Sequence, residues 1–237
     1  MKEISHLEPE QILNIIKQLP VFSTFDLTEQ TGFSGHHARL FSYHTGEFLI
    51  QEGDNDHSLF ILLVGAASVV KEGASIPLAM LKPGDLFGEM GFLLQQNRTT
   101  NVIVHPPTQT TDEPANLFLP ECPSLLAQAD PQATAMAILF DRAILQQQER
   151  GTRIRLKNQI IQCLMARVDA MHEQLARLTD HAPLLPIDAA LDGALHQEDD
   201  LSPEQLETTQ DRIVEQLVTF VEELNRQWVL APSSSHG

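Results

Sequence analysis

The sequence lacks several features, and each shortage excludes a class of protein. It has only two cysteines, Cys122 and Cys163, too few for a disulfide framework or a four-thiolate zinc site. Its longest apolar runs, such as residues 59–64, are far shorter than the roughly 20 residues of a membrane-spanning helix. The first residues include an early acid and no apolar segment typical of a secretory signal. We therefore expect a cytoplasmic protein with reduced thiols and no membrane span.

Basic residues are also scarce. The chain carries 15 Lys and Arg against 32 Asp and Glu, a formal net charge of −17. The excess of acid is uneven, because residues 142–178 are mildly basic whereas residues 179–237 hold two basic and twelve acidic side chains. An acidic surface repels the phosphate backbone of nucleic acids. DNA is therefore not an expected partner.

The first 141 residues carry the pattern of a mainly β domain. Apolar residues at helical spacing over residues 12–19, after Pro9, predict one short leading helix. From Leu40 to Val104, glycines separate short apolar runs every eight to twelve residues, which indicates a sandwich or barrel of short strands. The proline-rich stretch 105–134 interrupts this pattern as an insertion, with a possible short helix over 124–128, and residues 135–140 supply the last strand. We predict a jelly-roll-like β-roll, a double-stranded β-helix.

A long helix is expected over residues 142–179. From Ile154 its apolar residues fall into a heptad pattern that Lys157 alone interrupts, which predicts a two-stranded homodimer seam over 154–178. Packing of the same helix on its own β-roll is the alternative. The residues at the two heptad positions are Ile154, Ile161, Val168 and Leu175, and Leu164, Met171 and Leu178.

The chain ends in a linker and a second helix. Residues 180–201 contain prolines, a glycine and a run of acids, which is typical of a linker. Residues 202–237 are expected to hold an acidic amphipathic helix and a disordered tail. Ser202 is the N-cap of this helix, Pro203 is its first residue, and Gln205 completes a capping box. Its broad apolar face needs a cover. This chain's own helix, a second copy and a protein partner all stay open as that cover.

Residues 87–102 combine the groups that a cyclic phosphate ester needs. Glycines allow the backbone to bend closely, and Glu89 is followed nine residues later by Arg98. A guanidinium matches two phosphate oxygens, and exposed amides of a glycine-rich turn between two strands add further donors. A carboxylate accepts a hydrogen bond from a ribose hydroxyl.

This stretch resembles the phosphate-binding cassette of the cyclic-nucleotide-binding family, which includes protein kinase A regulatory subunits and bacterial catabolite activators. The resemblance extends over about residues 10–178, with Leu19–Phe22, Thr45–Asp54, Leu59–Leu62 and Leu81–Asp85 as further matching segments. Within the cassette, Asn97 replaces a usual proline, Thr99 and Thr100 replace two alanines, and Asn101 replaces Thr or Ser. The matching cassette residues are Phe87, Gly88, Glu89, Met90, Gly91, Arg98 and Val102.

The resemblance implies a non-catalytic sensor of a cyclic nucleotide, with cAMP expected first and cGMP or cyclic di-GMP as alternatives. Bacterial relatives often continue into a DNA-binding domain, but residues 179–237 are acidic, so output is expected through contacts with an unidentified protein. Glu89 would accept from the 2′-hydroxyl and Arg98 would bind the phosphate. The implied ligand-binding residues are Phe87, Gly88, Glu89, Met90, Arg98, Thr99 and Thr100.

Two other functions stay open. The cassette could be kept only as architecture, in a ligand-free scaffold for protein contacts. A metal-dependent β-roll enzyme would gather histidines with a glutamate, and His36, His37, His44, His57 and His105 are available. No pair of them has the His-x-His spacing that sets two imidazoles on one face of a strand, and no nucleophile motif or Walker-type loop is present. We therefore expect neither catalysis nor a bound metal.

Overall fold

The computed structural model describes residues 1–4, 7–106, 122–178 and 201–230. It divides into two compact units, one of residues 1–72 and 77–148, the other of residues 73–76 with the chain from residue 149 onward. Half of the predicted insertion, nearly all of the predicted linker and the predicted disordered tail lie outside the described residues. No helix in the described ranges is long and apolar enough to cross a membrane.

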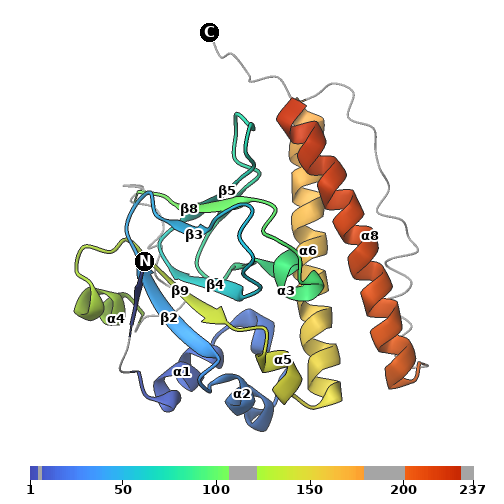
Figure 1. Cartoon of the computed structure of the whole chain (residues 1–237). Coiled ribbons are helices and arrows are strands. Elements are labelled where there is room, and N and C mark those ends of the chain that lie inside the picture. Colours follow the sequence, from blue (N-terminus) through green and yellow to red (C-terminus); the bar gives the residue numbers. More distant parts are fainter. Residues whose placement is uncertain (5–6, 107–121, 179–200, 231–237) are drawn as a thin grey trace. The chain divides into compact units, whose positions relative to one another are not determined.

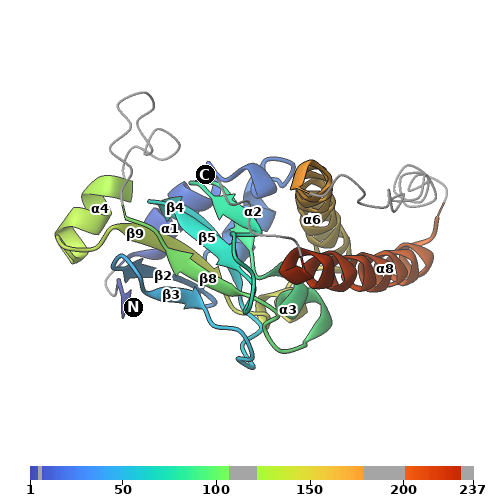
Figure 2. The ribbon, with the colours of Figure 1, turned by 90° about the horizontal axis from the view of Figure 1, so that it is seen from above.

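Two antiparallel sheets enclose the core of the first unit (Figures 1 and 2). The predicted last strand, β9 (Ala135–Phe140), lies between β2 and β4 and is buried along its whole length. A strand buried on both faces is expected to be a continuous apolar run, so the predicted β-roll, closed by this strand, is confirmed. One sheet has the order β1 (Lys2–Glu3), β2 (Ala38–Tyr43), β9, β4 (Leu59–Val64), β7 (Leu86–Phe87), and the other β3 (Phe48–Ile50), β8 (Asn101–Val104), β5 (Ala67–Val70), β6 (Ala79–Leu81).

Two helices and a 3-10 turn lie between β1 and β2. The predicted leading helix is α1 (Pro9–Ile16), which starts with a proline and is followed by the 3-10 turn η1 (Pro20–Phe22). A further helix, α2 (Leu27–Phe33), was not predicted, because it is only seven residues long and contains a glycine. A capping box at its start and edge-to-face packing of its Phe33 ring against Phe25 stabilise it.

The segment after β8 contains the helix α4 (Cys122–Ala129), which includes the short helix predicted within the insertion. The predicted long helix begins later than expected. A short helix, α5 (Ile144–Gln147), is followed by its C-cap residue Gln148, whose backbone is extended and whose side chain donates to the carbonyl of Gly32 at 3.1 Å. The long helix α6 therefore starts at Arg150 and ends at Leu178.

In the second unit, α6 packs against α8 (Pro203–Leu230), and the two lie side by side in Figure 1. Arg150 pairs with Glu207 near the start of both helices, and the ring of His172 packs against Phe220 further along both, so the helices run parallel. The Gln210 amide donates to the carbonyl of Ile154 at 2.9 Å and to Asn158. This buried polar contact favours one register of the pair.

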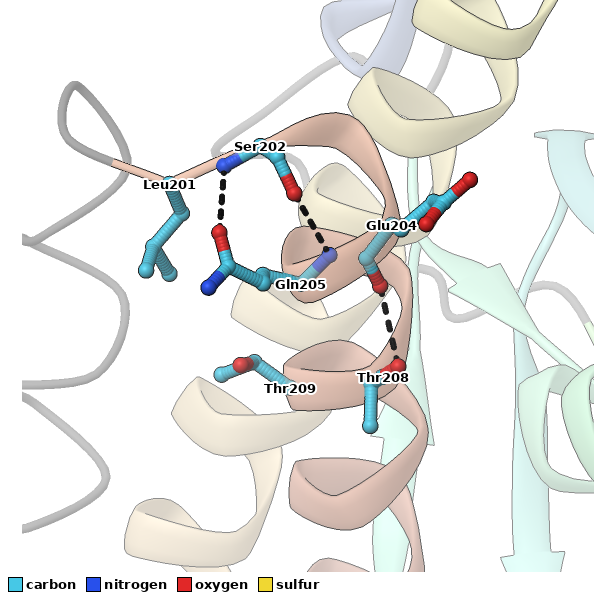
Figure 3. A pocket seen from close by; sticks show the side chains of 6 residues that line it. All are labelled: Leu201, Ser202, Glu204, Gln205, Thr208 and Thr209. Carbon is cyan, nitrogen blue, oxygen red and sulfur yellow. Dashed lines mark hydrogen bonds between the residues drawn. The ribbon is translucent and has the colours of Figure 1, made fainter.

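The predicted start of the last helix is confirmed. The Ser202 N–H donates to Gln205 Oε1 at 2.9 Å, and the Gln205 N–H donates to Ser202 Oγ at 3.4 Å, forming the capping box (Figure 3). These residues, with Thr208 and Thr209, line an open hollow on the first turns of α8. One of the three possible covers of the apolar face is present in the structure, because residues of α8 pack on α6 of the same chain.

Tyr43 carries an orphaned polar atom in the core of the first unit. Its side chain is fully buried, and its hydroxyl has no hydrogen-bond partner among the described residues. Burial, and then the charges of Glu47 and Asp56, raise the pKa of this hydroxyl above its usual value, so it stays neutral.

We expect Tyr43→Phe to leave the free energy of unfolding unchanged or to raise it by about 1 kcal/mol, because the substitution removes an unsatisfied polar atom and keeps the ring. Urea unfolding of the two proteins measures the difference. A loss above about 1 kcal/mol would show that the hydroxyl has a partner.

Candidate functional site

The predicted cassette lies between β7 and β8 and contains a helix. The sequence predicts a short turn between two strands here, but residues Glu89–Leu94 form the helix α3. Gly88 is its N-cap residue with a left-handed φ of 79°, and Glu89 is its first residue. A carboxylate is favourable at the first turn of a helix. Helical periodicity could not reveal α3, because six residues are too few to show it.

Arg98 is the buried centre of the cassette, with 5% of its surface exposed. Its Nη1 donates to the carbonyl of Gly88 at 2.8 Å, and its Nη2 donates to the carbonyl of Ser58 at 2.6 Å and to the Asp56 carboxylate. The guanidinium also lies over the ring of Phe60, 5.6 Å from its centroid. Its Nε is buried and has no hydrogen-bond partner among the described residues. The arginine is thus held rigidly while one of its donors is unsatisfied.

Two glycines make room for this guanidinium. A Cβ at Gly91 would lie 2.8 Å from Arg98 Nη1, and a Cβ at Gly88 would lie 2.9 Å from the same atom. Gly88 also has a backbone conformation that other residues rarely adopt. These glycines, expected from the sequence to let the backbone bend closely, therefore also allow Arg98 to approach α3.

Asp56 is the charged partner of Arg98. Burial alone would raise the pKa of its carboxyl group, but the hydrogen bond and charge of Arg98, with hydrogen bonds from Ser58, lower that pKa below its usual value. The Asp56 side chain is 46% exposed, whereas that of Arg98 is 3% exposed. The pair therefore lies at the boundary between the buried guanidinium and solvent.

The lowered pKa makes the contribution of Asp56 to stability depend on pH. The contribution is complete above the unfolded-state pKa of about 4 and is lost as the pH falls through the lower folded-state pKa. We expect wild type to exceed Asp56→Asn in unfolding free energy by at most about 1 kcal/mol at pH 7, because the carboxylate is half exposed, and by less at pH 3. Urea unfolding at both pH values measures this, and a pH-independent difference would contradict it.

The predicted site residues have different surroundings. Phe87 belongs to the core, stacks on Phe60 at 5.3 Å and pairs with Phe60 in the sheet, so its side chain is part of the packing of the domain. Glu89 and Met90 are buried, and Thr99 and Thr100 are half-buried. The contact of Gly88 with Arg98 is present, as described above. That these residues bind a ligand stays a prediction.

Several residues around Arg98 were not predicted. Asp56 and Ser58 lie 42 and 40 residues before it in the chain, in a polar loop that gives no signal of this pairing. Asn101, which departs from the family pattern, accepts a hydrogen bond from the Glu52 backbone N–H at 2.8 Å. Its amide thus ties the loop before Asp56 to the start of β8.

Comparisons with known proteins agree with this geometry. Residues 40–111 match the family model described as "Cyclic nucleotide-binding domain". A cyclic nucleotide-binding domain from Methylobacillus flagellatus superposes with a TM-score of 0.53 at 17% identity, over 75% of this chain and 86% of the other, which shows a shared fold. The chain contains a cyclic nucleotide-binding domain. The resemblance stated from the cassette is therefore confirmed.

Curated relatives of this domain are regulatory proteins. The cAMP-dependent protein kinase regulatory subunit of Neurospora crassa is 31% identical over 90 residues, which are 38% of this chain and 23% of that protein. The corresponding subunit of Pyricularia oryzae is 29% identical over 90 residues, with the same shares. The chain thus spans about a quarter of the length of these relatives. Within the described residues, no three His, Cys, Asp or Glu side chains gather as a metal site would need.

Proposed function

We propose that this protein is a non-catalytic cytoplasmic sensor that binds cAMP at the cassette and signals through protein contacts. The observation that carries the proposal is the rigidly held, buried guanidinium of Arg98 with an unpartnered Nε, inside a cyclic nucleotide-binding domain. A phosphate ester would satisfy that donor and bring its negative charge to a buried cation. Glu89 would accept from the 2′-hydroxyl. The relatives named for cAMP-dependent regulation support the choice of cAMP.

Calorimetry with cAMP, cGMP and cyclic di-GMP tests the proposal, with 5′-AMP as a control that has the same base without the cyclic ester. We expect saturable binding of cAMP and none of 5′-AMP at the same concentration. Absence of binding for all three cyclic nucleotides up to millimolar concentration would overturn the proposal.

One observation favours the alternative of a ligand-free scaffold. The Asp56 carboxylate already accepts from the Nη2 of Arg98, so this anion belongs to the chain itself. A phosphate would have to bind beside Asp56 or displace it. The same calorimetry separates the two functions, because a scaffold binds none of the nucleotides. The metal-dependent enzyme makes a different prediction, namely stoichiometric zinc, iron or manganese in elemental analysis of the purified protein.

A homodimer through residues 154–178 is the other part of the proposal. Support comes from the heptad spacing alone, because Ile154, Ile161 and Val168 are already buried within the single chain. Because α8 packs on α6 within one chain, a dimer needs a surface of α6 that α8 leaves free, or an exchange of α8 between copies. Light scattering with and without cAMP tests this, and a monomer in both conditions would contradict it.

A further inference from the structure

The last turns of α8 contact residues 73–76, which lie in the hairpin that joins β5 to β6 and belong to the same compact unit as α8. Trp228, the only tryptophan of the chain, is 1% exposed and donates from Nε1 to the carbonyl of Ile76 at 3.2 Å. Ile76 lies in the turn of residues 73–76, which belongs to the same compact unit as α8. A Cβ at Gly73 would lie 3.5 Å from a methyl group of Val229, an ordinary packing distance. The hairpin turn is therefore part of the surface that buries Trp228.

The other end of the same hairpin is tied to the cassette. Lys71 donates from Nζ to the carbonyl of Thr99 at 2.9 Å and pairs with the Glu52 carboxylate. The backbone N–H of Glu72 donates to the same carboxylate at 3.2 Å. Thr99 directly follows Arg98 in the chain. Three hydrogen bonds thus connect the base of the hairpin with the cassette and with the loop that contains Glu52.

That loop is itself fixed to Arg98. The Gly53 N–H donates to the carbonyl of Arg98 at 2.8 Å, and the Arg98 N–H donates to the carbonyl of Asp54 at 2.9 Å. A displacement of the Arg98 backbone would therefore act on Lys71 from two sides, through Thr99 and through the loop of Glu52. Neither of these two connections to Lys71 involves the Arg98 guanidinium group, which we propose binds the phosphate.

We infer that residues 71–76 couple the cassette to the docking of α8, with Lys71 as the contact on the cassette side and Trp228 as the contact on the helix side. Only four residues separate Lys71 from Ile76 in the loop that joins β5 to β6, and the pairing of β5 with β6 closes this loop at its base. A shift of Lys71 at the base of the loop reaches Ile76 through this short stretch of backbone. Loss of the Lys71 contacts should therefore loosen the surface on which Trp228 rests.

Acrylamide quenching of Trp228 fluorescence tests the coupling in the ligand-free protein. Lys71→Met keeps the length of the side chain and removes its charge and donors, and Lys82→Met is the matched control at an exposed lysine after β6. We expect the quenching constant to rise at least twofold in Lys71→Met and to stay at the wild-type value in Lys82→Met. Glu52→Gln, a smaller change, should shift it in the same direction. Equal constants in all four proteins would overturn the inference.

Ligand dependence of the coupling rests on the proposed function, and a cAMP titration followed by both calorimetry and Trp228 emission tests it. In wild type, we expect Trp228 emission to change during the titration with the same midpoint as the calorimetric curve. In Lys71→Met, we expect cAMP to bind without this change in emission. Binding without an emission change in wild type would overturn the ligand-dependent coupling and leave the proposed function intact. Absence of binding would contradict the proposed function alone, because quenching decides the coupling without ligand.

Discussion

Replacing Arg98 with alanine should weaken cAMP binding by a factor between about 30 and several thousand, which corresponds to about 2–5 kcal/mol. The substitution removes the buried cation that faces the phosphate and leaves the phosphate charge without a partner. Arg98→Lys should also bind at least about tenfold more weakly, because an ammonium lacks the planar fork that reaches Gly88 and Ser58 together. Calorimetry measures both affinities.

Arg142 offers a matched control for this experiment. Its Nε donates to the carbonyl of Phe92 in α3 at 2.6 Å, so it too is an arginine bonded to the backbone of the cassette helix. It has no predicted role in binding, and Arg142→Lys should keep the wild-type affinity within about threefold. Circular dichroism before the titration checks that each variant is folded. A folded Arg98→Lys that binds cAMP as tightly as wild type would contradict the role given to the guanidinium.

The cassette could be predicted from sequence because its residues lie within one short segment. Spacing shows Glu89 and Arg98, and the glycines between strands indicate close turns. The partners that fix the Arg98 side chain could not be predicted in this way. Asp56 and Ser58 come from a loop about 40 residues away, which the pairing of β3 with β8 and of β4 with β7 brings to the cassette. Local pattern carries no information on such a contact.

The two long helices show a related limit. Heptad spacing from Ile154 indicates that an apolar stripe must be covered, but it does not say by which helix. Here α8 of the same chain contributes cover, with Leu217 and Leu224 buried on its face. The capping box at Ser202 was predictable because it depends on residues three positions apart. The contact of Trp228 with Ile76, 152 residues away, was not.

A substitution at Gly65 should cost much more stability than one at a glycine with similar backbone geometry. Gly65 joins β4 to β5 with a left-handed φ of 88°, and a Cβ there would lie 2.4 Å from the carbonyl oxygen of Thr134 and 2.9 Å from the Cβ of Ala135. The left-handed conformation costs a non-glycine residue about 1 kcal/mol or more. The overlap with backbone adds about 1–3 kcal/mol. We therefore expect Gly65→Ala to lower the free energy of unfolding by about 2–4 kcal/mol.

Gly46 separates the two contributions. Its φ is 84°, nearly the same as that of Gly65, but a Cβ there would meet no atom within 4 Å. Gly46→Ala should therefore cost only the backbone term of about 1 kcal/mol. Urea unfolding followed by circular dichroism measures both variants, and the difference between them reports the close approach of Gly65 to the start of β9. Equal losses of unfolding free energy in the two variants would mean that β9 shifts to accommodate the methyl group at residue 65. The contact between the β4–β5 turn and Thr134 would then not fix the position of β9.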